Sequence, residues 1–130
     1  MFLLETDTLV NLLRGTSRVM ENINAHRAAP KFFSVISYGE LVHGCRKSQR
    51  VDHNLYKIQL LVEYYKIIDV TVPIMDCFGE VKATLQRAGT PVEDMDLIIA
   101  CTALAMNYTL VTNNTKHFQK IPGLKLVNWS

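Results

Sequence analysis

The sequence has no hydrophobic run long enough to cross a membrane. The longest candidate, Leu97 to Met106, is about half of the roughly 18–20 apolar residues that a spanning helix needs. The N-terminal apolar residues are not preceded by basic ones and reach Glu5 and Asp7 at once, unlike a secretion signal. We therefore expect a soluble, cytoplasmic protein without membrane contact.

Cysteine is scarce and shows no pairing pattern. The three cysteines, Cys45, Cys77 and Cys101, are odd in number and widely spaced, which favours neither a disulfide framework nor a CxxC metal clip. The four histidines show no zinc-type spacing with each other or with the cysteines. The sequence therefore indicates a reducing compartment and no zinc site.

A large excess of charge of one sign is also absent. Fourteen Lys and Arg residues against twelve Asp and Glu residues give a net charge of +2, which is too small to indicate nucleic-acid binding by itself. The hydrophobic share of 48% is high enough for a packed core. A length of 130 residues is typical of one domain, so we expect a single domain over residues 1–130.

Hydrophobic periodicity predicts strands that alternate with helices. Amphipathic or apolar helical patterns separate most of the β-rich runs, and Gly15 and Gly89 mark two helix ends. This alternation predicts an α/β fold with a central, mostly parallel sheet of about five strands flanked by helices. The expected strands are residues 2–4, 32–36, 67–72, 108–112 and 125–127.

Acidic and amide side chains follow several of the expected strands. Glu5 and Asp7 follow the first, Glu40 the second, Asp96 lies near the start of a late helix, and residues 112–114 follow the fourth strand. Ligands of open α/β sheets bind beyond the carboxyl ends of the strands. Because converging carboxylates repel one another unless a cation lies among them, such a cluster implies Mg²⁺ or Mn²⁺. A water polarised by such an ion can attack a phosphodiester.

Each of these residues also has a structural interpretation. Ser37 and Glu40 have the spacing of a capping box, whereas Asp7 and Asp96 can complement the dipoles of their helices. Asn residues such as those at 113–114 commonly form turns. Taken one at a time, the residues leave the structural and the functional interpretation open.

Three segments together resemble one family. They are LLETDTLVNLLRG, SVISYGELVHGC and PVEDMDLIIACTALAMNYTLVTNNTKHFQKIPGLKLVNW, and they resemble PIN-domain ribonucleases of the VapC toxin type. The resemblance covers nearly the whole chain and is most specific in the last segment, where D-L-I-I-A, T-N-N-x-x-x-F and I-P-G-L occur in the family's order. It implies a PIN-like fold.

The resemblance also implies a set of site residues. The family's three acids fall on Glu5, Glu40 and Asp96, which are the expected metal ligands and catalytic residues, and Asp7 occupies a further catalytic position. The family's fourth polar ligand position falls in the turn at residues 112–114, where this sequence has Asn114. Thr112, Asn113 and Asn114 are expected either to bind substrate or to support the acids. Arg14 and Lys116 are expected in the same roles, because an anionic substrate that reaches an acidic site needs cations nearby.

Two positions depart from the family pattern. Glu5 stands where the family has aspartate, and one added methylene displaces the carboxylate in a metal shell that tolerates little displacement. His117 stands where an acid is sometimes found before the phenylalanine. The first departure predicts weakened activity.

The function implied by the resemblance is a Mg²⁺- or Mn²⁺-dependent endoribonuclease toxin that cuts tRNA or rRNA. A VapB-type antitoxin would inhibit it. A homodimer, and a heterooligomer with the antitoxin on operator DNA, are expected. Two alternatives stay open: a catalytically weakened PIN domain that acts as a protein-binding module, and a small-substrate phosphatase with Asp7 as nucleophile.

Overall fold

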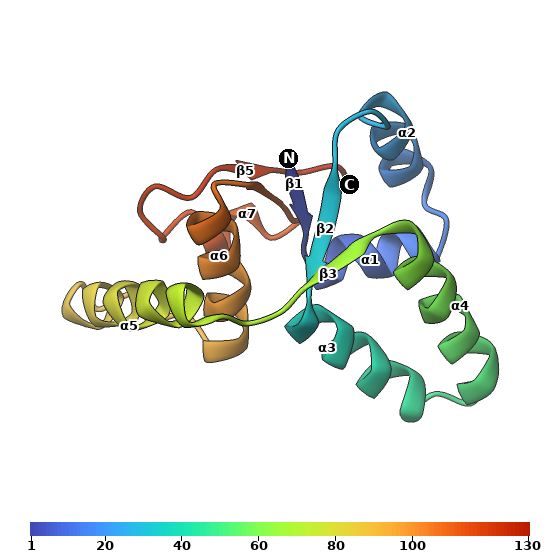
Figure 1. Cartoon of the computed structure of the whole chain (residues 1–130), viewed down its shortest axis with the longest axis horizontal. Helices are drawn as coiled ribbons and strands as arrows, with labels where there is room; N and C mark the ends of the chain where they lie inside the picture. Colours follow the sequence, from blue (N-terminus) through green and yellow to red (C-terminus); the bar gives the residue numbers. More distant parts are fainter.

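The centre of the computed structural model, which describes residues 1–130, is one sheet of five strands. Every neighbouring pair is parallel, and the strand order is β3-β2-β1-β4-β5, so that β1 lies in the middle (Figure 1). This confirms the predicted mostly parallel sheet of about five strands. The strands are β1 (Phe2–Leu4), β2 (Lys31–Ser34), β3 (Lys66–Ile68), β4 (Thr109–Val111) and β5 (Leu126–Val127).

Seven helices connect the strands and cover the sheet. None of them combines the length and the apolar character that crossing a bilayer requires. They are α1 (Thr6–Leu13), α2 (Ser17–Ala25), α3 (Val35–Arg46), α4 (Val51–Tyr64), α5 (Val72–Arg87), α6 (Asp94–Met106) and α7 (Thr115–Phe118).

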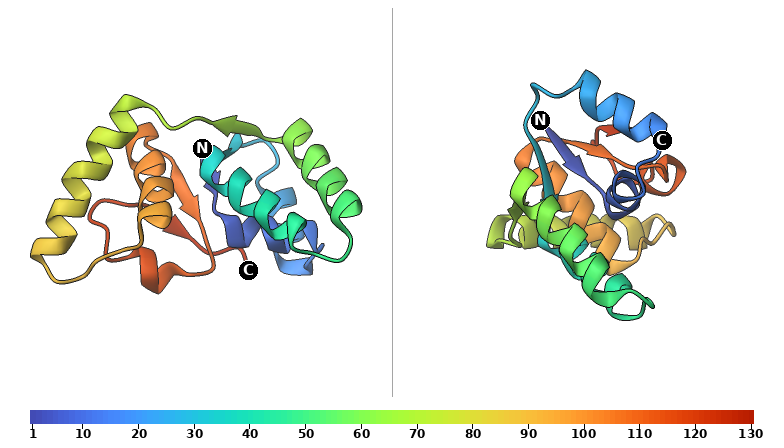
Figure 2. Two further views of the ribbon diagram at one scale, coloured as in Figure 1. Left: turned by 90° about the horizontal axis from the view of Figure 1, so that it is seen from below. Right: turned by 90° about the vertical axis from the view of Figure 1, so that its right-hand side faces the viewer.

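Alternation along the strands divides the core into two clusters. Leu3 of β1 and Leu110 of β4 pack in a cluster that contains residues of α5 and α6. Their neighbours Leu4 and Val111 belong to a second cluster with residues of α1, α3 and α4. Successive strand side chains point to opposite faces, so the sheet separates the two helical layers, as Figure 2 shows.

The start of α3 differs from the sequence prediction. The helix begins at Val35, and the Oγ of Ser34 caps it by accepting a hydrogen bond from the Ile36 backbone N–H at 3.0 Å. The predicted capping box of Ser37 and Glu40 is therefore wrong, as is the extension of the second strand to Ile36. Ser37 is instead buried within the helix, where its hydroxyl meets α1.

Two further boundaries differ. The third strand ends at Ile68 rather than at Val72, because Val72 and Pro73 already form the first turn of α5, where proline is favoured. The short helix α7, which follows the turn at residues 112–114, was not among the predicted elements. The predicted breaks at Gly15 and Gly89 are confirmed, since both follow helix ends with φ of +70° and +72°, a backbone conformation that favours glycine.

Candidate active site

The carboxyl ends of β1 and β4 place Glu5 beside Thr112. These strands are direct neighbours in the sheet, and the Glu5 backbone N–H donates to the Val111 carbonyl at 3.0 Å. Glu5 is the N-cap of α1, and its Oε2 accepts a hydrogen bond from the Asp7 N–H at 3.2 Å. The Thr112 Oγ1 lies 3.4 Å from the same oxygen. Glu5 is thus held between two elements that are far apart in sequence.

Three polar groups surround the Asp7 carboxylate. The Asn113 backbone N–H donates to Asp7 Oδ2 at 3.1 Å, and the Thr112 Oγ1 lies 3.2 Å from that oxygen. The Thr8 Oγ1, which donates to the Val111 carbonyl at 2.9 Å, lies 3.3 Å from Asp7 Oδ1. Asn114 supports this arrangement, because its N–H donates to Thr112 Oγ1 at 3.0 Å. The turn predicted to carry polar site residues therefore meets the acids of α1, chiefly through its backbone and Thr112.

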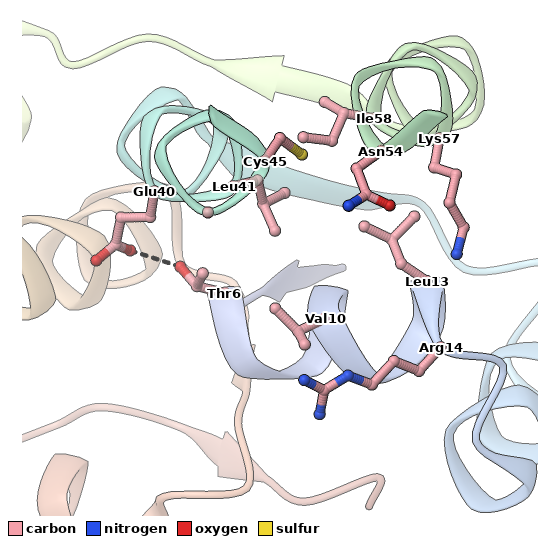
Figure 3. Close-up of a pocket in the computed structure, with 11 residues that line it drawn as sticks. Thr6, Val10, Leu13, Arg14, Glu40, Leu41, Cys45, Asn54, Lys57 and Ile58 are labelled. Atoms are coloured by element: carbon pink, nitrogen blue, oxygen red, sulfur yellow. Dashed lines mark hydrogen bonds between the residues drawn. The ribbon is translucent and has the colours of Figure 1, made fainter. Parts of the chain in front are cut away.

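Glu40 reaches the start of α1 from α3. Its exposed carboxylate accepts a hydrogen bond from the Thr6 Oγ1 at 2.6 Å (Figure 3). The Thr6 Oγ1 also lies 2.9 Å from the Ser37 Oγ. Thr6 therefore connects Glu40 to the turn that carries Glu5 and Asp7.

Asp96, in the first turn of α6, pairs with a residue of α7. Its Oδ2 lies 3.1 Å from the Nε2 of His117, and about a quarter of each side chain is exposed, 25% for Asp96 and 24% for His117. The histidine occupies the position at which the sequence departs from the family's acid. In this chain His117 therefore contacts Asp96, the third of the expected metal ligands.

Burial and neighbouring carboxylates raise the pKa of Glu5. Only 6% of the residue is exposed, and this burial, the hydrogen bonding and charge of Asp7, and the charge of Asp96 raise its pKa from 4.5 to about 9. Two acids therefore lie near enough to act on Glu5 electrostatically. A divalent cation bound among these carboxylates would reduce the repulsion between them.

The donor chemistry fits a hard cation, since carboxylate and hydroxyl oxygens are the ligands of Mg²⁺ and Mn²⁺. In the structure itself, however, no three His, Cys, Asp or Glu side chains are grouped as ligands of one ion. Glu40 is bound to Thr6 and Asp96 to His117. The joint ligation of one ion by Glu5, Glu40 and Asp96 stays a prediction.

A cavity of about 310 Å³ lies beside Glu40, between α1, α3 and α4 (Figure 3). Its lining combines apolar side chains with Thr6, Glu40, Arg14 and Lys57. Arg14, expected from the sequence to contact substrate, therefore lies in a hollow that adjoins one of the acids. Lys116 is exposed on α7, and it forms no hydrogen bond or ion pair within the chain.

The sequence analysis did not identify Thr6 and Thr8 as site residues. Both lie in the first turn of α1, where the Thr6 hydroxyl contacts Glu40 and the Thr8 hydroxyl lies beside Asp7. The signal was present, since polar residues alternate with acids in ETDT, but short polar side chains of this kind are also common at helix starts. Contacts between residues distant in sequence, such as that of Thr6 with Glu40, are needed to tell a site residue from an ordinary helix cap.

We expect replacement of Glu5 by Gln to stabilise the metal-free protein at alkaline pH. Between pH 4.5 and 9 the folded chain keeps a proton on Glu5 that the unfolded chain releases, so stability falls as the pH rises through this window. Gln is neutral throughout. Thermal melts in EDTA should show the variant higher by roughly 3–10 °C at pH 8 and closer to the parent at pH 5. Parallel curves at all pH values would mean that Glu5 titrates normally.

A second variant tests the contact of His117 with Asp96. His117→Ala removes the group at 3.1 Å from the carboxylate, and loss of such an orienting partner typically costs about tenfold or more in activity. His117→Gln keeps a donor and should retain most of the RNA cleavage that the resemblance implies. Both variants should melt close to the parent, because partly exposed pairs contribute little to stability. Equal cleavage rates for Ala and His at position 117 would show that Asp96 needs no such partner.

Comparison with known proteins places these features in a family. The PIN domain model matches residues 2–124. Ribonuclease VapC2 of Rickettsia felis is 38% identical over 96 residues, which is 74% of this chain and 72% of that protein. The chain belongs to the PIN-domain family, in its VapC branch.

Two further comparisons extend the similarity of this PIN domain over its full length. The tRNA(fMet)-specific endonuclease VapC of Salmonella typhimurium is 30% identical over 131 residues, covering 98% of this chain and 97% of that protein. A crystal structure of VapBC2 from Rickettsia felis, bound to a promoter DNA fragment, contains a chain with a TM-score of 0.94 and 31% identity, covering 99% and 98%. The predicted PIN-like fold and the resemblance to VapC proteins are thereby confirmed.

Proposed function

We propose that this PIN domain is a divalent-metal-dependent endoribonuclease toxin that hydrolyses phosphodiester bonds of tRNA or rRNA. The observation that carries the proposal is the meeting of Glu5, Asp7 and Thr112 at the carboxyl ends of β1 and β4, where the Thr112 Oγ1 lies 3.4 Å from the Glu5 carboxylate and 3.2 Å from that of Asp7. Membership of the VapC branch favours RNA hydrolysis over the alternative of a phosphatase with Asp7 as nucleophile.

Glu5, Glu40 and Asp96 would hold Mg²⁺ or Mn²⁺. When bound, such an ion supplies charge stabilisation at phosphoryl oxygens and makes a water a better nucleophile. Asp7 is held by Thr112 and the Asn113 N–H, which fixes its oxygens near Glu5, and we assign it a catalytic role there. We assign phosphate contacts to Arg14, Lys116, Asn113 and Asn114, because a polyanionic substrate approaching an acidic edge needs cations and donors nearby.

Structures of VapBC complexes support an antitoxin partner and an assembly on DNA. The Rickettsia felis structure contains VapBC2 on promoter DNA, so we propose that a VapB-type antitoxin inhibits this chain and that the two form a heterooligomer on operator DNA. We further propose a homodimer in the cytoplasm.

The test is RNA cleavage by the purified chain with and without divalent metal. We expect cleavage of a tRNA or an rRNA fragment in Mg²⁺ or Mn²⁺, none in EDTA, and recovery when metal is restored. Cleavage that continues undiminished in EDTA after dialysis would contradict the metal-dependent mechanism.

A second candidate is a catalytically weakened PIN domain that binds a protein partner. Two observations favour it: glutamate at position 5, and the absence of a preformed group of three metal-binding side chains. Calorimetric titration with Mn²⁺ separates the candidates, since a vestigial site should bind the ion weakly or not at all. Tight Mn²⁺ binding that is lost in Asp96→Asn supports the nuclease.

A further inference from the structure

The cavity of about 310 Å³ beside Glu40 differs in chemistry from the acidic edge that it adjoins. It lies between α1, α3 and α4, and its wall on the side of the acids contains Thr6 and Glu40, joined by a hydrogen bond of 2.6 Å (Figure 3). Thr6 stands between Glu5 and Asp7 in the chain. A ligand in the cavity would therefore lie next to a phosphodiester held at these two acids.

Aliphatic side chains from three helices form one part of the wall. They are Val10 and Leu13 of α1, Leu41 of α3 and Ile58 of α4, and Figure 3 shows them around a common space. Sites for small organic molecules combine apolar walls with a few polar groups and typically enclose about 300–1,000 Å³. The cavity is at the lower end of this range, which suits one nucleoside better than a longer piece of polymer.

Two cations and one amide also line the cavity. The side chains of Arg14 and Lys57 take part in neither of the two ion pairs of the chain and in no side-chain hydrogen bond. The Asn54 Nδ2 donates to the Ser48 Oγ at 3.0 Å, whereas the Asn54 Oδ1 has no partner in the chain. The cavity thus offers positive charge for phosphate and an acceptor for an N–H group.

We propose that this cavity binds one unpaired nucleoside of the RNA, next to the bond that is cleaved. The aliphatic side chains cover the base, and the Asn54 Oδ1 accepts a hydrogen bond from a base N–H group. Lys57 and Arg14 contact the adjoining phosphates. The inference rests on the proposed function, since it assumes that the chain holds RNA at the acidic edge.

Charge complementarity favours RNA over a segment of protein as the occupant. Glu40 is the only acid in the lining, and its carboxylate already accepts a hydrogen bond from Thr6. The two cations of the lining therefore remain available to a polyanion. The pocket shape favours an unpaired nucleoside, because a base stacked within a duplex cannot turn into a cavity.

Gly44 of α3 allows the cavity to be filled while its walls stay in place. It lines the cavity, and no heavy atom of another segment lies within 4 Å of the position that a Cβ would occupy. Gly44→Leu therefore puts a side chain into the space proposed for the base. Because leucine favours helices more than glycine does, the variant should melt no lower than the parent.

Gly79→Leu is the matched control. Gly79 is an exposed residue within α5, with equally free space around it, and α5 contributes nothing to the lining of the cavity. The control introduces the same side chain into a helix and leaves the cavity open.

The first experiment measures cleavage of a short RNA that spans a bond cut by the parent chain, with the base removed from one nucleotide at a time. At one position next to the cleaved bond, loss of the base should lower kcat/KM at least about tenfold. Gly44→Leu should lower kcat/KM on the intact RNA by a similar factor and lose little more on the abasic RNA, since both changes remove the same contact. Gly79→Leu should behave like the parent.

The second experiment detects the nucleoside site without cleavage. Amide NMR spectra of the folded parent chain in EDTA are recorded with each ribonucleoside monophosphate in turn. At least one nucleotide should shift the resonances of Gly44 and Ile58 and leave that of Gly79 in place. Such shifts in a chain that cleaves no RNA would support the nucleoside site and contradict the proposed function.

Other results overturn the nucleoside site while the nuclease function stands. RNA cleavage that is unaffected by Gly44→Leu would show that the cavity serves a different occupant, such as a segment of a protein partner. Effects of base removal that multiply with that of Gly44→Leu at every position would place the bases elsewhere. The absence of a shift at Gly44 with any nucleotide, or an equal shift at Gly79, would also contradict the site.

Discussion

Replacing Asp96 with Asn should reduce RNA cleavage at least about a hundredfold while the protein stays folded. The substitution removes a charge at the position where we expect a metal ligand. Its structural cost is small, because the side chain is partly exposed and its one polar partner is His117. Loss of the Asp96 charge also relieves its repulsion of the buried Glu5, so the metal-free variant should melt no lower than the parent.

Asp94→Asn is the matched control for this experiment. Asp94 lies in the same first turn of α6, but it is exposed and pairs with Lys82 at 2.8 Å instead of facing the site. It should cleave at the parental rate. If Asp96→Asn cleaves as fast as Asp94→Asn at saturating Mg²⁺, Asp96 has no role in catalysis.

Replacing Glu5 with Asp should increase cleavage, by up to about a hundredfold. One methylene moves the carboxylate by roughly an ångström, and misplacement of that size can cost this much in rate. The fold tolerates the change, because Glu5 acts as the N-cap of α1 and aspartate is among the favoured N-cap residues. Initial rates on the same RNA, with Mn²⁺ affinity measured in parallel, provide the comparison.

The double variant Glu5→Asp with Asp96→Asn is the control. It should be inactive, which shows that the gained activity uses the same site. An unchanged rate and unchanged metal affinity in Glu5→Asp would show that the pocket is adapted to glutamate, and the expectation of weakened activity would then be wrong.

The sheet could be predicted from sequence because its strands have an unambiguous pattern. Adjacent leucines such as Leu3 and Leu4 must enter different cores, and short, continuously apolar runs between helices are typical of parallel strands buried on both faces. The start of α3 could not be predicted in the same way. Ser34 and Ser37 are both possible caps, and the contact of Thr6 with Glu40 and Ser37 is invisible to local spacing.

The site was predictable in its residue types but not in its contacts. The position after each strand indicated Glu5, Asp7 and the turn at 112–114, and the structure brings these together. The pairing of Asp96 with His117 and the support of Asp7 by a backbone N–H depend on how distant segments pack. Such contacts cannot be predicted from the type and spacing of the side chains.

The central place of β1 has a consequence for the synthesis of the protein. The acids of the first turn are made at the outset, yet Asp7 is held by Thr112 and the Asn113 N–H, and β1 finds one of its two neighbours in β4. A nascent chain that has not yet emerged through β4 contains Glu5, Asp7 and Glu40 without the segment that orients them. If the proposed function is correct, a chain truncated before β4 should therefore lack an ordered site and should not cleave RNA.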